Sequence, residues 1–374
     1  FIVFEEIDEF GRVCLEEKQE LFTNNPNELN FVIAPGMKCN YKCKYCFQKN
    51  LDLTGVMTPE IAVDTAEYIC KQLQSRPSVR KLNITWFGGE PLLFVDIIEI
   101  ISRKLIKYTE QNGIGYYSII NTNGRLLDEN TLTAIRDCCV NVAQITLDGT
   151  RNIYCENKGV TPKDFDCVID NIKHSAEIIK IFIRLNIPNN EANEAITITD
   201  YLFTECNLLG KIGIHFSFVR DHSLPNESAQ QAYVNYIDNY FLWANHVIEH
   251  YGKSHFFGEW PKRVSMNCSR VKTSNGCIGS HGELFRCLHD FGNVSKKIGD
   301  IWNGKYYNET DFSYYTTIDT PQRHKCSQCK YLPIHMGECK DFSLIGYSGF
   351  DCESYAKLKF KLKLFKAGIY DKLI

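Results

Sequence analysis

The sequence predicts an α/β protein with a parallel sheet, followed by a cysteine-rich segment. Between residues 31 and 220, short apolar runs alternate with amphipathic stretches about six times. After Pro261 the chain changes to Gly, Cys, His and short runs, and its cysteines are grouped rather than evenly spread. Repeated strand–helix alternation is typical of a parallel sheet, either open or curved into a partial barrel.

Each predicted strand is a short run rich in β-branched or aromatic residues. The runs are Phe31–Pro35, Leu82–Phe87, Tyr116–Thr122, Val142–Leu147, Ile179–Ile187 and Ile212–Val219. The predicted helices between them are Pro59–Leu73, Phe94–Tyr108, Glu129–Asp137, Asp164–Glu177 and Glu194–Glu205. Proline suits the first turn of a helix, so Pro59 after Thr58 marks a helix start.

The second half of the chain begins with one longer predicted helix. Residues 227–252 carry regularly placed aromatic and aliphatic side chains, including Tyr236, Tyr240 and Trp243. No further long periodic segment occurs until Lys357–Leu373. We therefore expect a domain boundary near residues 250–262.

The composition excludes several classes of protein. Of the 374 residues, 44% are hydrophobic and 23% are charged, which is ordinary for a globular chain and unlike a disordered one. A net charge of −3 offers no basic field for nucleic acid. No apolar run approaches ~20 residues, and the first residues turn acidic too early for a secretory signal. We therefore expect a cytoplasmic protein with no nucleic-acid or membrane partner.

Seventeen cysteines are unusual for a cytosolic chain that needs no disulfide framework. Seven are scattered, as expected of buried inert thiols: Cys14, Cys70, Cys138, Cys139, Cys155, Cys167 and Cys206. Grouped cysteines in a reducing compartment indicate metal binding. The groups are Cys39, Cys43 and Cys46, then Cys268, Cys277, Cys287, Cys326, Cys329, Cys339 and Cys352.

The first group has the spacing C-x3-C-x2-C directly after the first predicted strand. The thiolates of Cys39, Cys43 and Cys46 can hold three irons of a cubane [4Fe–4S] cluster and leave the fourth iron to a substrate or cofactor. The alternative is a zinc site that takes a fourth ligand from elsewhere in the chain.

This loop resembles the signature of the radical S-adenosylmethionine (SAM) enzymes, with Tyr45 as the aromatic residue before the third cysteine. Gly88-Gly89-Glu90-Pro91, after the second predicted strand, resembles the GGEP motif of that family. In the family this motif receives the methionine amino group of SAM, which suits close backbone approach at glycine and the negative charge of Glu90. Taken alone, the motif could equally be an ordinary strand-to-helix turn.

The resemblance implies further cofactor-binding residues along the barrel. It places Asn123, in the run 121–124, at the cofactor site and gives the Thr146 hydroxyl to the SAM carboxylate. Lys158 stands where relatives of the sulfatase-maturing kind carry an arginine, and it supplies the charge without the bidentate fork. Arg184, in the middle of a strand, could reach cofactor or substrate. Alternatively, Thr146 and Lys158 occupy ordinary strand and surface positions, and Arg184 forms a structural ion pair.

The C-terminal cysteines resemble the SPASM domain, which holds two auxiliary [4Fe–4S] clusters. The family pattern is C-x2-C-x5-C-x3-C followed by one more cysteine, and His335 occupies a cysteine position here. The resemblance implies a first auxiliary cluster on Cys268, Cys277, Cys287 and Cys339. It implies a second on Cys326, Cys329 and Cys352, with His335 as fourth ligand or with one iron open. Zinc is the alternative, because a Cys3His set also suits zinc.

A catalytic base is the remaining candidate. Sulfatase-maturing relatives place an aspartate immediately after the cysteine that matches Cys287, where this chain has Leu288. His289 or Asp290 could accept a substrate proton instead. A turn-forming aspartate is an equally ordinary explanation of Asp290.

The resemblance implies a partial (β/α)6 TIM-like barrel followed by a small cysteine-rich α+β auxiliary-cluster (SPASM) domain. The expected division is a leader at 1–30, the barrel at 31–255, the SPASM-like domain at 256–355 and a final helix at 356–374.

The same resemblance implies an enzyme that cleaves SAM reductively to a 5′-deoxyadenosyl radical, which abstracts hydrogen from a substrate. The substrate would be a ribosomally made precursor peptide that gains a thioether, carbon–carbon or carbon–oxygen crosslink. The electron would come from a low-potential donor such as ferredoxin or flavodoxin. One alternative is a sulfatase-maturating, formylglycine-generating enzyme, against which Leu288 counts. Another is an iron–sulfur electron carrier, which would need no GGEP motif.

Overall fold

The computed structural model describes residues 27–49, 51, 54–187, 192–217, 219, 226–252 and 275–305. The chain divides into two compact units. The larger one comprises Asn24–His222 and Ser274–Tyr307, and the long helix α8 (Asn226–Tyr251) belongs to the other. The predicted helix Lys357–Leu373 lies outside the described residues.

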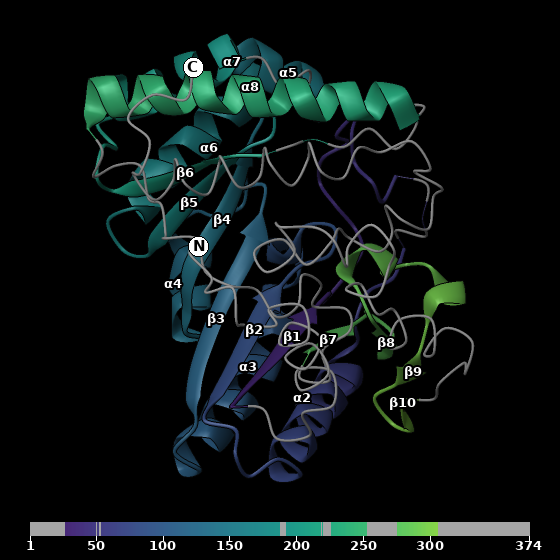
Figure 1. The fold of residues 1–374 in the computed structure, drawn as a ribbon. Coiled ribbons are helices and arrows are strands. Elements are labelled where there is room, and N and C mark those ends of the chain that lie inside the picture. Colours follow the sequence, from purple (N-terminus) through teal and green to yellow (C-terminus); the bar gives the residue numbers. More distant parts are fainter. Residues whose placement is uncertain are drawn as a thin grey trace, which may run out of the picture. The chain divides into compact units, whose positions relative to one another are not determined.

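A mixed sheet organises the larger unit (Figure 1). Its six predicted strands are confirmed as β1 (Glu28–Ile33), β2 (Lys81–Trp86), β3 (Gly115–Thr122), β4 (Val140–Leu147), β5 (Lys180–Leu185) and β6 (Ile212–Phe216). Each pairs in parallel with the next, in chain order. Within the described part of the chain the sheet ends at β6 without closing on itself. The α/β class and the partial barrel are therefore confirmed.

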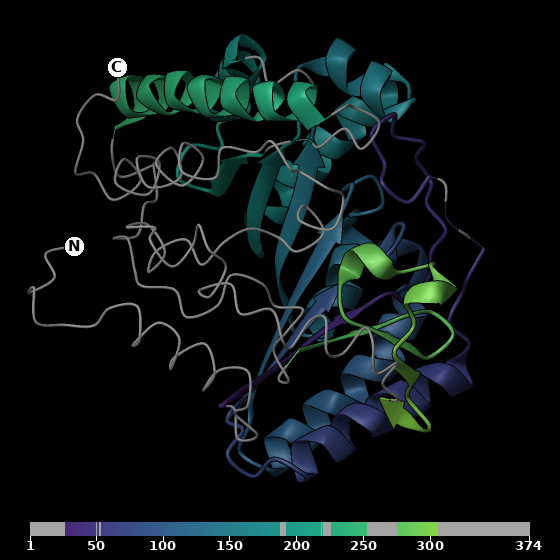
Figure 2. The same ribbon diagram turned by 45° about the vertical axis from the view of Figure 1, so that its right-hand side comes forward.

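Helices connect the strands and cover one face of the sheet (Figure 2). They are α2 (Pro59–Gln74), α3 (Val95–Gln111), α4 (Glu129–Asp137), α5 (Arg151–Lys158), α6 (Pro162–Ser175) and α7 (Ala192–Asp200). Helix α2 begins at Pro59 as predicted, and the Thr58 hydroxyl accepts a hydrogen bond from the Ile61 amide at 3.3 Å. The predicted helix Glu194–Glu205 is α7 followed by the π-helical turn η3 (Tyr201–Glu205).

Alternation along the strands explains how the sheet packs. In β2 the side chains of Leu82, Ile84 and Trp86 are buried, while the residues between them are only half-buried. This period of two places one face of the strand in the helix-covered core. The indole N–H of Trp86 donates to the Ser118 hydroxyl of β3 at 2.9 Å, so even its polar atom is satisfied there.

The cysteine-rich segment extends the same sheet, which the sequence analysis did not anticipate. Strand β7 (Asn275–Ile278) pairs in parallel with β1 and places Cys277 opposite Val32. The short strands β8 (Glu283–Phe285), β9 (Gly299–Asp300) and β10 (Gly304–Lys305) follow in antiparallel order. Strands this short carry no usable period, so only the long-range pairing reveals them.

Helix α8 confirms the prediction for residues 227–252. It spans 26 residues, and Tyr236, Tyr240, Trp243 and Val247 are buried at spacings of three and four. Such spacing gives a helix one apolar face. No helix in the described ranges is both long enough and apolar enough to cross a membrane.

The loops that follow β1 and β2 touch each other at two glycines. A side chain at Gly88 would collide with the carbonyl oxygen of Gly36, and Gly88 has a φ of 120° that disfavours other residues. A side chain at Gly89 would collide with the carbonyl oxygens of Met37 and Lys38. The amide of Gly89 donates to Gly36 O at 3.2 Å. Only glycine therefore allows this approach.

We predict that Gly89→Ala destabilises the larger unit by about 2 kcal/mol or more, because the added methyl group meets backbone atoms that cannot rotate away. Gly113→Ala is the matched control. Gly113 has a φ of 63° and open space around it, so alanine there should cost only about 1 kcal/mol of backbone strain. Urea unfolding of the full chain measures both values, and equal losses would contradict the argument.

Candidate functional site

The carboxyl ends of the parallel strands bring the predicted motifs to one edge of the sheet. The cysteine loop follows β1, the Gly88–Pro91 turn follows β2, Asn123 follows β3 and Asp148 follows β4. Ligand sites of parallel α/β proteins lie at this edge. The fold thus assembles the motifs that the sequence placed far apart.

The cysteine loop lies between β1 and α2. Cys39 is exposed, Cys43 and Cys46 are partly exposed, and none of the three forms a disulfide. The backbone N–H of Tyr41 points at Cys39 Sγ, with 3.4 Å between nitrogen and sulfur. Across the described ranges, no three His, Cys, Asp or Glu side chains gather closely enough to bind one metal ion.

Glu90 is held by three donors inside the protein. The amide of Leu92 (3.0 Å) and the Thr122 hydroxyl (2.7 Å) donate to Oε1, and the amide of Asn123 (2.8 Å) donates to Oε2. The side chain is only 1% exposed. Burial raises the pKa of Glu90, and these hydrogen bonds oppose that rise. The backbone N–H of Glu90 also donates to Lys38 O at 2.9 Å, which ties the turn to the cysteine loop.

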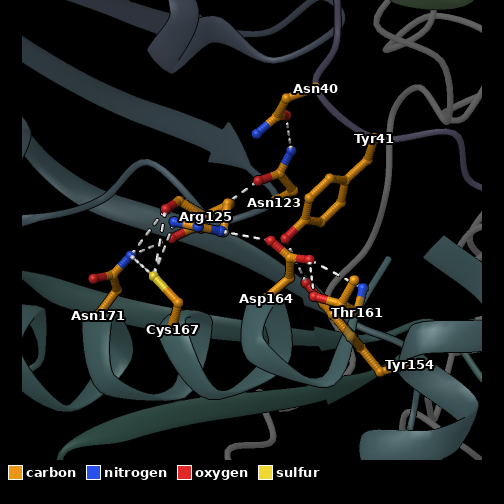
Figure 3. Close-up of polar contacts among 10 residues, drawn as sticks. Asn40, Tyr41, Asn123, Arg125, Tyr154, Thr161, Asp164, Cys167 and Asn171 are labelled. Atoms are coloured by element: carbon orange, nitrogen blue, oxygen red, sulfur yellow. Dashed lines mark hydrogen bonds and ion pairs between the residues drawn. The ribbon is translucent and has the colours of Figure 1, made fainter. Parts of the chain in front are cut away.

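Asn123 joins the end of β3 to the cysteine loop (Figure 3). Its Nδ2 donates to Asn40 Oδ1 at 2.7 Å, and its Oδ1 accepts from the amide of Arg125 at 2.9 Å. Arg125 in turn donates through Nε to Asp164 Oδ1 of α6 at 2.8 Å. The hydroxyl groups of Tyr41 and Tyr154 lie 3.4 Å apart beside this chain of contacts.

Lys158 lies at the end of α5 and is buried, with only 2% of its side chain exposed. Its Nζ donates to Tyr45 Oη and to Thr146 Oγ1, both at 3.0 Å, and lies 3.4 Å from Asp148 Oδ1. The Tyr45 hydroxyl donates to the Asp148 carboxylate at 2.7 Å. Burial would lower the pKa of Lys158, yet the Asp148 carboxylate, its strongest charged neighbour, raises that pKa well above the usual lysine value.

Arg184 lies in β5 opposite Thr146 of β4 and is half-buried. Its Nε donates to Asn186 Oδ1 at 3.0 Å. Because β5 alternates between faces, Arg184 is on the face opposite the buried Ile181, Ile183 and Leu185. Thr146 and Arg184 are therefore neighbours there, whereas Lys158 approaches Thr146 from α5.

The described part of the cysteine-rich segment lies against the cysteine loop. Cys287 Sγ is 3.5 Å from His289 Nδ1, and the His289 ring meets the Phe47 ring edge-on at 4.7 Å. Asp290 is buried at 8% exposure, and Cys277 is buried in a cluster with Phe285 and Phe291. The other predicted auxiliary ligands lie outside the described residues: Cys268, Cys326, Cys329, His335, Cys339 and Cys352.

Asp148, Asn40 and the helix α5 escaped the sequence analysis. Asp148 lies two residues after Thr146, but no local pattern connects it to Lys158, which lies ten residues further along the chain. Helix α5 has only eight residues, fewer than the about 11–18 over which a helical repeat of apolar residues is counted. A search for opposite charges near predicted strand ends could have suggested the Lys158–Asp148 pair.

Comparison with known families now identifies the domains. Residues 33–201 match the model of the radical SAM superfamily, and residues 268–330 match that of the SPASM iron–sulfur cluster-binding domain. The chain carries a radical SAM domain followed by a SPASM domain. These domains imply SAM and iron–sulfur clusters as cofactors.

Curated relatives are distant. The radical SAM cyclopropyl synthase TigE of Paramaledivibacter caminithermalis is 35% identical over 103 residues, which cover 24% of this chain and 21% of that one. The Fe-coproporphyrin III synthase of Methanosarcina barkeri is 24% identical over 45% of this chain and 39% of its own. A cysteine-type anaerobic sulfatase-maturating enzyme of Clostridium perfringens is 23% identical over 83% of this chain and 89% of its own. The chain thus spans less than half the length of the first two relatives.

Solved structures share the fold. Native anSMEcpe with bound AdoMet and the Kp18Cys peptide superposes with a TM-score of 0.67 at 17% identity, covering 91% of this chain and 98% of that one. Streptococcus suis SuiB bound to the precursor peptide SuiA gives a TM-score of 0.55 at 18% identity, covering 88% and 75%. Both likenesses support the partial barrel of the radical SAM domain.

The Arg125–Asp164 contact generates a pH prediction. Arg125, together with Thr161, lowers the pKa of the Asp164 carboxyl. A lowered folded-state pKa means that the stabilisation is present above about pH 4 and is lost as the pH falls through the folded value. We expect Asp164→Asn to cost up to about 1 kcal/mol at neutral pH, since the pair is partly exposed.

Urea unfolding of both proteins at several pH values measures this difference, which should shrink below about pH 4. Asp170→Asn on the same helix is the control, because the Asp170 carboxylate is 77% exposed and pairs only loosely with Lys173 at 3.7 Å. A difference that stays constant through the acid range would contradict the assignment.

Proposed function

We propose that this protein is a radical SAM peptide maturase that forms a thioether, carbon–carbon or carbon–oxygen crosslink in a ribosomally made precursor peptide. The observation that carries the proposal is the joining of the C-x3-C-x2-C loop to the Gly88–Glu90 turn at one sheet edge. An electron carrier has no need of the second element. The SPASM domain would add further iron–sulfur clusters to that site.

Cys39, Cys43 and Cys46 would hold the [4Fe–4S] cluster that binds SAM. Their thiols are free of disulfides and the Tyr41 amide already points at one sulfur, so the donor set fits a cluster. When bound, the cluster and SAM would supply a 5′-deoxyadenosyl radical that removes hydrogen from a substrate carbon. An external donor such as ferredoxin or flavodoxin would provide the electron.

Gly88, Gly89 and Glu90 would receive the amino group of SAM. Among the described residues, Glu90 Oε2 accepts one hydrogen bond, and a carboxylate oxygen accepts two. One acceptor position on Oε2 therefore suits an ammonium group. Asn123, Thr146 and Arg184 would complete the cofactor and substrate edge, with Arg184 on the face of β5 opposite the buried Ile181 and Ile183.

A peptide substrate is supported by what related structures contain. Kp18Cys is a peptide bound to anSMEcpe, and SuiA is the precursor peptide bound to SuiB. For this chain we propose His289 or Asp290 as the group that accepts a substrate proton. His289 is the better placed, because its ring meets Phe47 immediately after the cysteine loop.

Sulfatase maturation is the second candidate. The Clostridium perfringens sulfatase-maturating enzyme aligns with 83% of this chain, a far longer match than that to TigE. Against it, Leu288 occupies the position after Cys287 where the aspartate base is expected. A leucine side chain cannot accept a proton.

We also propose two auxiliary [4Fe–4S] clusters in the SPASM domain. The first would bind Cys268, Cys277, Cys287 and Cys339. The second would bind Cys326, Cys329 and Cys352, with His335 as fourth ligand or with one iron open.

Reduced, anaerobically reconstituted protein is expected to convert SAM to 5′-deoxyadenosine. Replacing Cys39, Cys43 and Cys46 by alanine should abolish this product, because the cluster would lose its ligands. Chromatography of the nucleoside products measures it, and undiminished 5′-deoxyadenosine from the triple variant would overturn the assignment.

Mass spectrometry of a supplied peptide then separates the candidates. Crosslinking removes two hydrogen atoms from a precursor peptide, whereas sulfatase maturation converts one Cys or Ser side chain to an aldehyde. An aldehyde on a sulfatase peptide, with no change in precursor peptides, would favour the second candidate.

Iron content tests the auxiliary clusters. Three cubanes require about twelve irons per chain, and about eight should remain after loss of the Cys39, Cys43 and Cys46 ligands. Iron and zinc are measured together in the reconstituted protein. About four irons with stoichiometric zinc would show instead that the SPASM domain is a zinc module.

A further inference from the structure

We propose that Lys158, Asp148 and Tyr45 form a buried anchor that positions the cysteine loop, and that Lys158 is a positioning residue rather than a contact to SAM. The proposal rests on the proposed function only in taking this loop as the cluster loop. It gives Lys158 a role other than the one that the family resemblance implies.

The ammonium group of Lys158 has no donor to spare. An ammonium carries three N–H donors. Three oxygens surround Nζ: Tyr45 Oη and Thr146 Oγ1 at 3.0 Å each, and Asp148 Oδ1 at 3.4 Å. The side chain is 2% exposed and that of Asp148 is fully buried. A carboxylate arriving from solvent would therefore have to displace a partner inside the protein.

Asp148 completes the link to the loop. Both of its carboxylate oxygens lie within hydrogen-bond distance of the Tyr45 hydroxyl, at 2.7 and 2.8 Å. Tyr45 immediately precedes Cys46, whereas Asp148 follows β4 and Lys158 ends α5. The anchor thus fastens the third cysteine of the loop to a strand and to a helix.

The backbone of α5 supports the same loop. The last carbonyl groups of a helix have no partner within it. Here the amide of Lys42 donates to Lys158 O at 3.4 Å and the amide of Lys44 donates to Asn157 O at 2.9 Å. Gly159 ends α5 in the left-handed conformation, with a φ of 67°, so the helix stops where the loop needs these carbonyls.

A surface contact on the same loop provides the matched control. Lys44 Nζ pairs with Glu156 Oε1 at 2.6 Å, and the two side chains are 59% and 66% exposed. Exposed pairs contribute little, because water and salt screen them. Glu156→Gln should therefore leave the loop in place, although the Lys44–Glu156 pair, like the anchor, connects the loop to α5.

Hydrogen–deuterium exchange of the reconstituted full chain, without SAM, tests the anchor. Two variants break it in different ways: Tyr45→Phe removes the hydroxyl on the loop, and Lys158→Met with Asp148→Asn removes both charges together. Amide exchange in residues 40–46 should accelerate about tenfold or more in both, while exchange in β2 stays unchanged. Glu156→Gln should match the unmodified protein.

SAM binding by equilibrium dialysis on the same preparations separates the two roles of Lys158. Lost SAM affinity with unchanged loop exchange would overturn the proposal, because Lys158 would then act on the cofactor. Unchanged exchange with unchanged affinity would overturn it as well. If the double variant also exchanges faster in β2, it has unfolded. Tyr45→Phe then decides the proposal: faster exchange confined to residues 40–46 supports it, and unchanged exchange there overturns it. If the unmodified protein fails to cleave SAM, the proposed function fails while the exchange comparison still decides the anchor.

Discussion

The buried contact between Lys158 and Asp148 is the constraint on which the site depends. Taking two charges out of water is costly, and their attraction offsets that cost only when geometry and hydrogen bonding are complete. Tyr45 and Thr146 complete it here. Removal of one partner from such a pair costs about 3–5 kcal/mol, because the remaining charge stays buried. The cysteine loop, which has little regular structure of its own, takes its conformation from this fixed point.

The beginning of the loop, at residues 36–38, is held by close backbone contacts. Gly88 and Gly89 lie so close to the loop that no side chain fits, and Glu90 uses its carboxylate to hold Thr122 and the Asn123 amide. The beginning of the loop is thus held by close packing, and its end at Tyr45 is held by the buried ion pair. A loop held at both ends presents its thiols in one arrangement, which a cluster with three protein ligands requires.

The sequence predicted whatever is local or periodic. The six strands, the start of α2 at Pro59 and the motifs at the strand ends follow from short patterns that a single window contains. The Lys158–Asp148 contact was missed because it depends on how α5 turns back toward β4, which no window shows. The pairing of β7 with β1 joins residues about 245 positions apart and is invisible for the same reason.

That pairing changes how the two domains are understood. Because β7 continues the sheet beside β1, Cys277 and the cysteine loop belong to one hydrogen-bonded framework rather than to two linked bodies. The rings of Phe47 and His289, and those of Phe87 and Phe291, pack across the same junction. The part of the SPASM segment that the structure describes, from β7 to β10, is therefore part of the barrel's own sheet. The spacing between the first cysteine group and the Cys277 region is consequently set by strand geometry, which a flexible linker could not do.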